Sequence, residues 1–149
     1  MQNIKQFPCY YPVDAKRIVK VNTWWLRNEA ADAFESMRNA YQALFPKHKF
    51  LITSAGRTHD EQIALYKQKP GLAAKPGNSF HESGLAVDCA VTIMKAQAGW
   101  TQEQFQDFAI KFGFHRTVER EPWHFSFSSE ALPNTRATQK ASLIYIGNK

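Results

Sequence analysis

The chain has 149 residues, the length of a single domain that is large enough to enclose a hydrophobic core. Hydrophobic residues make up 44% of the sequence and aromatic residues 13%, so the composition is globular and excludes a disordered chain. The formal net charge of +6 favours anionic partners. The lysines and arginines are scattered along the sequence without a basic helix, so nucleic acid is not expected among those partners.

The sequence contains no apolar run of the ~18 residues that a membrane-spanning helix needs. Its first residues, Met1–Lys5, lack the apolar region of a secretory signal peptide. We therefore expect either the mature form of an exported protein or a protein made in the cytoplasm without that signal. Cys9 and Cys89 do not form a disulfide framework, and Cys89 is expected to be a buried free thiol in an apolar run.

The predicted elements begin with an N-terminal arm over residues 1–24, which we expect to be irregular because it contains Pro8 and Pro12. From Asn28 to Phe45 apolar residues recur every three or four positions, which predicts an amphipathic helix that ends at Pro46. Residues 49–54 follow as a short buried strand.

Two capping boxes predict the next helices. Thr58–Glu61 opens a helix that continues to about Gln68, and Thr101–Gln104 opens another over 102–112. Alternating apolar residues predict strands over 85–91 and 123–127. Helices and short strands therefore interleave without regular βαβ repeats, which favours an α+β fold with a small, mainly antiparallel sheet and flanking helices. Residues 128–149 carry no motif and form a C-terminal extension of this single domain, 1–149.

Candidate metal ligands occur in two separate parts of the sequence. His81 lies at a turn that Gly84 makes possible, and Asp88 follows seven residues later on the polar face of a predicted strand. His124 lies on the polar face of the last predicted strand. If these strands are neighbours, the two imidazoles and the carboxylate converge on one ion. Three such ligands with an open position for water are typical of a catalytic zinc site.

A spare carboxylate precedes the last of these ligands. Glu121 is three residues before His124, and Pro122 prevents a regular strand between them, so Glu121 is predicted to face the bound water as a general base. Each half of the pattern also has a structural interpretation, since His81 can be an ordinary turn residue and 121–124 the start of a surface strand. The remaining histidines lack neighbouring ligands and are expected to be exposed or half-buried: His48, His59 and His115.

Taken together, four ordered blocks of the sequence resemble the VanY-like D-alanyl-D-alanine carboxypeptidases. This resemblance covers about residues 25–127, and the wider family includes VanX-type dipeptidases, phage endolysin peptidases and hedgehog-like domains. The blocks are Ser54-Ala55-Gly56-Arg57, Glu61-Gln62 with Leu65-Tyr66, Ser79-x-His81-x-x-Gly84-x-Ala86-x-Asp88, and Glu121-Pro122-Trp123-His124-Phe125.

The resemblance implies a hedgehog/DD-peptidase-like fold and one Zn²⁺ ion bound by His81, Asp88 and His124. It also implies that Glu121 is the catalytic base. Arg57 would polarise the scissile carbonyl, a role that suits a permanently charged planar guanidinium. The alternative for Arg57 is a surface charge at the start of a helix.

Three further residues are implied to contact substrate: Ser79, Gln62 and Trp123. Ser79 would bind the terminal carboxylate. Gln62 can instead be an ordinary helix residue, and Trp123 can instead pack in the core.

The function implied by the resemblance is zinc-dependent hydrolysis of amide bonds in the peptidoglycan stem peptide, as by a D,D-carboxypeptidase. An L-alanyl-D-glutamate endopeptidase is the alternative, and a short basic chain also fits a phage endolysin or a delivered enzyme that acts in the periplasm or cell wall. We expect a monomer whose positive charge favours anionic cell-envelope polymers. A non-catalytic zinc-binding interaction domain is the competing class, and the presence of Glu121 argues against it.

Overall fold

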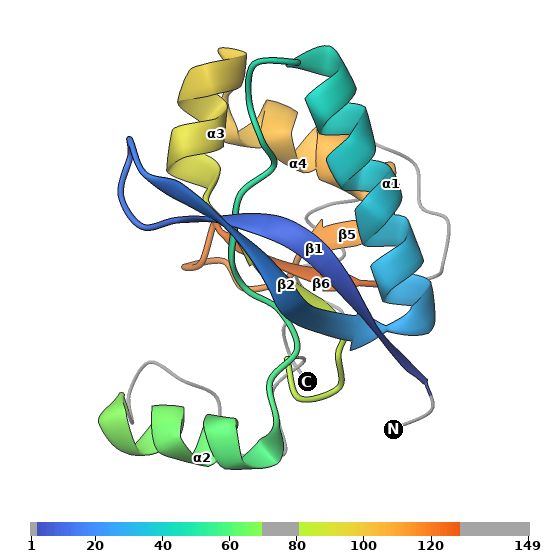
Figure 1. Cartoon of the computed structure of the whole chain (residues 1–149), viewed down its shortest axis with the longest axis vertical. Coiled ribbons are helices and arrows are strands. Elements are labelled where there is room, and N and C mark those ends of the chain that lie inside the picture. The colour runs from blue at the N-terminus through green and yellow to red at the C-terminus, as the bar shows by residue number, and fades with distance from the viewer. Residues whose placement is uncertain (1–2, 70–80, 129–149) are drawn as a thin grey trace.

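The computed structural model describes residues 3–69 and 81–128 (Figure 1). Its strands form two antiparallel groups, a hairpin of β1 with β2 and a four-stranded sheet in the order β3-β4-β6-β5. This arrangement confirms the predicted α+β fold. The elements in chain order are β1 (Ile4–Pro12), β2 (Ile18–Arg27), α1 (Asn28–Leu44), β3 (Ile52–Ser54), α2 (His59–Gln68), β4 (Ala86–Cys89), α3 (Val91–Ala98), α4 (Gln102–Ile110), β5 (Phe114–Arg116) and β6 (His124–Phe127).

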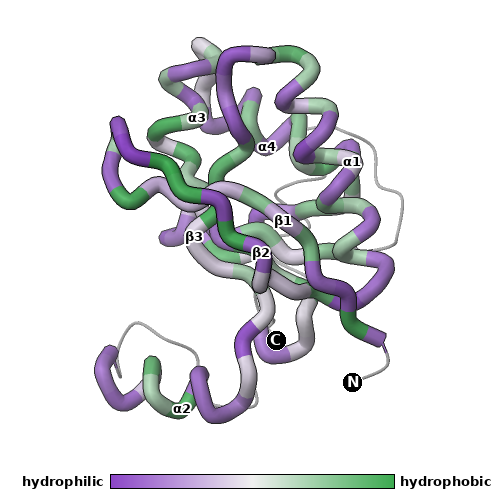
Figure 2. The backbone as a smooth tube through the Cα atoms, viewed as in Figure 1, coloured by the Kyte–Doolittle hydropathy of each residue, from purple (hydrophilic) through white to green (hydrophobic). Residues whose placement is uncertain are grey.

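The helices occupy two ends of the molecule. In Figure 1, α1, α3 and α4 gather at one end, whereas α2 stands apart at the other. Figure 2 shows that α2 is hydrophilic over much of its length, consistent with its position away from the core. No helix within 3–69 or 81–128 is long and apolar enough to cross a bilayer.

A mainly aromatic core joins the hairpin, α1, α4 and the sheet. Phe34 of α1 packs at a ring-centroid distance of 4.7 Å from Phe7 of β1, 5.5 Å from Phe50 and 6.2 Å from Phe114 of β5. Phe125 of β6 is also fully buried and lies 5.6 Å from Phe105 of α4. Each such burial contributes about 1.5–3 kcal/mol, so the strand β6 is held firmly in place.

The predicted irregular arm is wrong, because residues 4–27 form the β1–β2 hairpin. Phe7 and Cys9 alternate toward the core and are buried. Pro8 lies between them, where the register between the strands shifts, so its missing N–H does not interrupt the pairing. An isolated parallel bridge from Tyr10 to Leu51 joins the hairpin to the chain just before β3.

Two further elements were not predicted from the sequence. The strand predicted to run to Val91 ends at Cys89, and α3 begins at Val91 although its first residues are the β-branched Val91, Thr92 and Ile93. Tertiary packing overrides their low helix propensity, since Val91 and Met94 lie on one buried face. The second element, β5, is only three residues long, and it buries His115, which was expected to be exposed or half-buried.

The predicted helices over 28–45, 58–68 and 102–112 correspond to α1, α2 and α4. Both predicted capping boxes are confirmed: Thr58 caps α2 with Glu61, and Thr101 caps α4 with Gln104. Cys89 is a buried free thiol as expected.

Candidate active site

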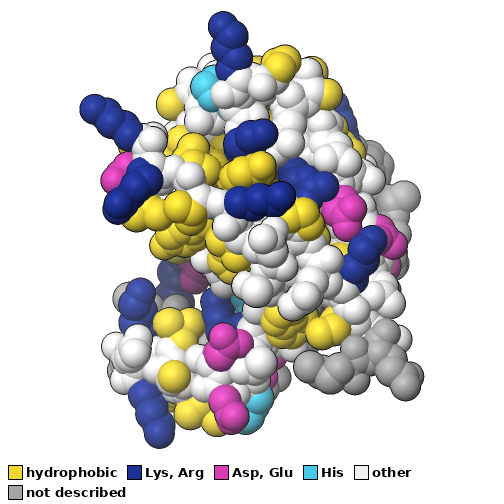
Figure 3. Space-filling view, viewed as in Figure 1, with side chains coloured by type: hydrophobic (Ala, Val, Ile, Leu, Met, Phe, Trp, Pro, Cys, Tyr) yellow, Lys and Arg dark blue, Asp and Glu magenta, His cyan; other side chains and the backbone are white. Residues whose placement is uncertain are grey.

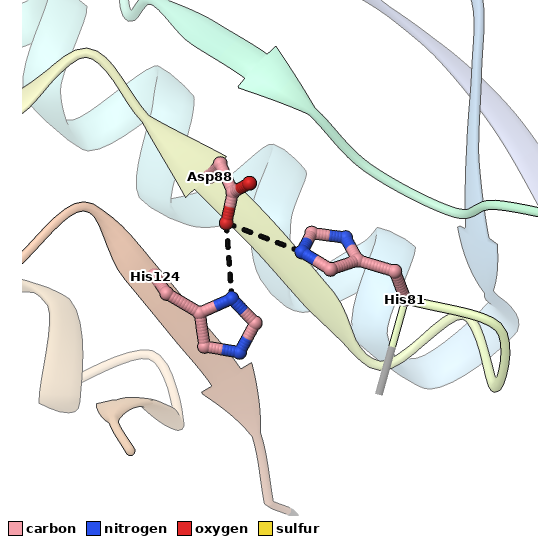
Figure 4. A group of neighbouring side chains, drawn as sticks. All are labelled: His81, Asp88 and His124. Carbon is pink, nitrogen blue, oxygen red and sulfur yellow. Dashed lines mark hydrogen bonds and ion pairs between the residues drawn. The ribbon is translucent and has the colours of Figure 1, made fainter. Parts of the chain in front are cut away.

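The predicted metal ligands converge from three segments of the chain. Asp88 of β4 pairs directly with His124 of β6 in the antiparallel register, so both side chains lie on the same face of the sheet. His81 belongs to the turn that precedes β4. In Figure 4 both imidazoles point to one carboxylate oxygen, with distances of 3.2 Å from His81 Nε2 and 3.0 Å from His124 Nδ1 to Asp88 Oδ1. The three ligand atoms lie within 4.8 Å of one another.

Each imidazole is oriented by a partner at its outer nitrogen. His81 Nδ1 donates to the carbonyl oxygen of Ala55 at 2.7 Å, which leaves Nε2 directed into the site. His124 Nε2 lies 3.3 Å from Ser126 Oγ, and Ser126 Oγ lies 2.8 Å from Thr117 Oγ1, so Nδ1 is the inward nitrogen. Such outer partners fix the tautomer and ring orientation of metal-binding histidines.

Asp88 supplies the negative charge of this group. Burial by itself raises the pKa of Asp88, but hydrogen bonds from His124 and His81 outweigh burial and hold the pKa well below its ordinary value. The side chain is therefore a carboxylate at neutral pH. Two oriented imidazoles and one half-buried carboxylate fit a zinc ion, which prefers nitrogen and oxygen ligands in this number at catalytic sites.

Glu121 lies beside the three ligands in the loop that leads into β6. Its Oε1 is 3.9 Å from His124 Nδ1, and its side chain is 23% exposed, so it reaches both the ligand cluster and solvent. The turn is closed by the backbone bond from His124 N to Glu121 O, 3.1 Å long. The predicted bend before β6 is therefore present, and it brings the Glu121 carboxylate to the inward nitrogen of His124.

Two side chains bond to the backbone of the loop that carries Glu121. Gln102 Nε2 donates to the carbonyl oxygen of Pro122 at 2.9 Å, and the Arg116 guanidinium donates to the carbonyl oxygen of Glu119. Both side chains also bond to Gln106 Oε1, at 3.0 and 3.1 Å. The loop thus rests on a hydrogen-bonded group that belongs to α4 and β5.

Arg57 is half-buried and held by two side chains. Its Nη1 donates to Gln62 Oε1 at 2.6 Å, and its Nη2 donates to Ser54 Oγ at 3.0 Å. Burial lowers the pKa of Arg57, and the carboxylates of Asp88 and Glu121 are among the groups that oppose this shift. The guanidinium is therefore a cation held in place within electrostatic reach of the site carboxylates, not a solvated charge at a helix start.

The remaining predicted residues differ in outcome. Gln62 was expected to contact substrate or to be an ordinary helix residue, but it is 1% exposed and orients Arg57. Trp123 is 42% exposed, which excludes the core packing that was the alternative for it. Ser79 lies outside the described residues. Ser126 was missed, although the two-residue period of a strand places it on the same face as His124.

The chain is similar to several known proteins. The VanY family, described as D-alanyl-D-alanine carboxypeptidase, matches residues 23–130. A D-alanyl-D-alanine carboxypeptidase of Enterococcus faecium is 30% identical over 131 residues, which is 80% of this chain and 42% of that protein. The chain spans about half the length of the curated relatives it matches, 42% and 48%.

Solved structures share the fold. The structure of VanYB in complex with D-alanine-D-alanine has a TM-score of 0.62 and 18% identity, and the match covers 87% of this chain and 88% of that one. A mutant of the D,D-pentapeptidase VanY from a VanB-type resistance cassette, in complex with Zn(II), has a TM-score of 0.59 and 19% identity over 86% of each chain.

Proposed function

Because the chain belongs to the VanY family of D-alanyl-D-alanine carboxypeptidases, we propose that it is a zinc peptidase acting on the peptidoglycan stem peptide. The observation that carries the proposal is the convergence of His81, Asp88 and His124, with Glu121 beside them and outside the ligand set. A binding domain needs only the three ligands. A carboxylate held next to them, and partly open to solvent, is what a hydrolytic reaction requires as well.

The catalytic roles are proposed from the family resemblance and supported by the positions of the side chains. Bound zinc supplies positive charge that acidifies water and polarises a carbonyl group. Glu121 takes a proton from the attacking water, whose oxygen bonds to the carbonyl carbon of the substrate. Arg57 donates hydrogen bonds to the carbonyl oxygen as negative charge develops there. The C–N bond then breaks, and Glu121 passes its proton to the leaving amine.

Substrate recognition is proposed on the remaining residues. Trp123, exposed and adjacent to His124, would form a wall of the substrate pocket. Ser79 would bind the terminal carboxylate of the peptide. The preferred substrate is a stem peptide ending in D-alanyl-D-alanine, since the VanYB structure that shares this fold contains that dipeptide.

The setting of the enzyme is proposed from its charge. Figure 3 shows Lys and Arg side chains spread over the viewed face, with Asp and Glu side chains mainly at its right edge and over α2. A monomer of net charge +6 would be drawn to anionic polymers of the periplasm or cell wall, where the substrate lies. Phage endolysins meet the same surroundings, so an endolysin acting as an endopeptidase is the alternative within the same chemistry.

Mass spectrometry of peptidoglycan fragments, incubated with the protein with and without a chelator, tests the proposal. Loss of a single terminal D-alanine, abolished by the chelator, is the expected result. Release of longer stem peptides would show an endopeptidase, including one that cuts L-alanyl-D-glutamate. If no product depends on the metal, the peptidase proposal is wrong and a zinc-binding interaction domain becomes the better account.

Variants separate the base from the ligands. Glu121→Gln should bind zinc normally but lose about 10²–10⁴-fold in kcat, the contribution typical of a general base. His81→Ala should lose both the metal and the activity. Glu119→Gln, an exposed carboxylate two residues before Glu121, is the matched control and should keep both. Retained activity in Glu121→Gln would remove this residue from the mechanism.

A further inference from the structure

The end of β2 contacts both loops that carry site residues. Gly56 N donates to the carbonyl oxygen of Trp25 at 2.8 Å, which ties the loop before Arg57 to the strand. Arg27 N donates to the carbonyl oxygen of Gly84, also at 2.8 Å, which ties the turn after His81 to the same strand. The β1–β2 hairpin, which the sequence motifs do not include, thus reaches the active site through its second strand.

The two loops are also bonded to each other. Arg57 N donates to the carbonyl oxygen of His81 at 2.8 Å, and His81 Nδ1 donates to the carbonyl oxygen of Ala55 at 2.7 Å. Three segments are therefore linked in pairs: residues 25–27 of β2, residues 55–57 and residues 81–84. We call this group of contacts the three-segment junction. It contains one metal ligand and the cation proposed to stabilise the carbonyl oxygen.

The indole of Trp25 fills the centre of this junction. A Cβ atom built on Gly56 would lie 2.4 Å from Trp25 Cδ2 and 2.5 Å from Cε2, so the ring rests directly on the glycine backbone. A Cβ atom on Gly84 would lie 3.0 Å from Trp25 Cζ3. The same six-membered ring therefore contacts both loops, and only glycine allows an approach this close.

The two neighbouring tryptophans of β2 have different surroundings. Both are half-buried, but Trp24 packs against the hydrophobic core cluster, whereas Trp25 is not among the residues that pack against it. Instead, the Trp25 ring contacts the glycines of the two loops that carry Arg57 and His81. A residue that served the core alone would have the surroundings of Trp24.

We propose that Trp25 is a positioning residue that fixes the Arg57 guanidinium relative to the metal ligand His81. The inference rests on the proposed function for its effect on turnover, but its effect on metal binding does not depend on that function. Without the ring, the 55–57 loop and the 81–84 turn lose the surface on which both rest. Displacements near 1 Å are enough to lower a rate about 10²-fold when reacting groups must be aligned.

The first test compares Trp25→Ala with Trp24→Ala, the matched control. Zinc affinity is measured by competition with a chelator, in buffer where circular dichroism shows each variant to be folded, and kcat and KM are measured on a D-alanyl-D-alanine peptide. Trp25→Ala should weaken zinc binding and lower kcat by about 10- to 100-fold, as losses of outer-shell partners do, with a smaller change in KM. Trp24→Ala should lower the thermal stability and leave zinc affinity unchanged. Equal zinc affinity in the two variants would overturn the proposal.

The second test uses the contact between the ring and Gly56. Gly56→Ala should displace the Trp25 ring and weaken zinc binding, whereas the double variant Trp25→Ala/Gly56→Ala should bind zinc no more weakly than Trp25→Ala. Additive losses would contradict a role through this contact. If wild-type protein binds zinc but hydrolyses no peptide, the proposed function fails while the affinity measurements still decide the role of Trp25.

Discussion

Replacement of Gly84 by alanine should destabilise the protein more than the same replacement at Gly99. Both glycines have a φ of +69°, in the left-handed region that costs other residues about 1–2 kcal/mol. Alanine also restricts the unfolded chain, which returns about 0.4–1 kcal/mol. The backbone contribution should therefore be the same at the two positions, a net loss of about 1 kcal/mol.

The surroundings of the two glycines then decide the difference. Among the residues that the structure describes, none has an atom within 4 Å of a Cβ atom on Gly99, which ends α3. A Cβ atom on Gly84 would lie 2.9 Å from the backbone nitrogen of Arg27, and that nitrogen bonds to Gly84 O. Because a backbone atom cannot turn away as a side chain can, the turn must move, at an overpacking cost of about 1–3 kcal/mol. Gly84→Ala should therefore lose about 2–4 kcal/mol in all.

Urea unfolding of the zinc-free protein, followed by circular dichroism, measures both losses without any contribution from the metal. Zinc affinity should fall in Gly84→Ala, since His81 belongs to the same turn, and should stay unchanged in Gly99→Ala. Equal unfolding free energies for the two variants would refute the reasoning, because they would show that the turn accepts a side chain without moving.

Three other predictions follow from single contacts. Arg57→Lys keeps the charge but loses the planar guanidinium that bonds Gln62 and Ser54, so kcat should fall at least 10-fold. Zinc affinity, measured by chelator competition, should be retained, and an unchanged kcat would contradict the role given to the guanidinium. Ser126→Ala removes the hydroxyl beside the outer nitrogen of His124 and should weaken zinc binding about 10-fold in the same assay. Unchanged zinc affinity would contradict this role of Ser126 and show that water can replace the hydroxyl at that nitrogen. Burial raises the pKa of Cys9 from 9.0 to about 12, so the folded state keeps the neutral thiol while the unfolded chain ionises. The stability that this thiol contributes should be complete below pH 9 and be lost between pH 9 and 12, at about 1.4 kcal/mol per pH unit. Urea unfolding at pH 8 and pH 10 should show a smaller pH dependence in Cys9→Ala than in the wild type, and equal slopes would contradict the assignment.

The grouping of His81, Asp88 and His124 could be predicted from the sequence because each residue lies within or next to a predicted strand. His81 precedes a strand, Asp88 lies within it, and His124 begins another, so a single assumption of neighbouring strands was enough to bring them together. The capping boxes of α2 and α4 were equally local, since the side chain and the backbone group that it caps are three residues apart.

The features that were missed depend on contacts between distant parts of the chain. The hairpin was hidden by Pro8, whose effect disappears only because the register shifts beside it. The hydrogen bond of Gln62 to Arg57 depends on the orientation of α2 relative to the loop before it. The periodicity of apolar residues along the sequence does not define this orientation. In the same way, α3 forms because Val91 and Met94 find a buried surface, which the helix propensity of its first residues does not indicate.

The pairing of β1 with β2 has a consequence for where the autonomous folding unit begins. The segment that matches the family starts at residue 23, inside β2, whereas β1 pairs with β2 along its length and buries Phe7 and Cys9. A truncated chain starting at the family boundary would keep His81, Asp88, Glu121 and His124. It would nonetheless cut β2 short, leave the rest of that strand without its hydrogen-bonded neighbour β1, and open an apolar gap beside α1. Transplanting the motif-bearing segment alone should therefore yield an unstable fragment, and a minimal functional unit has to extend back at least to Ile4.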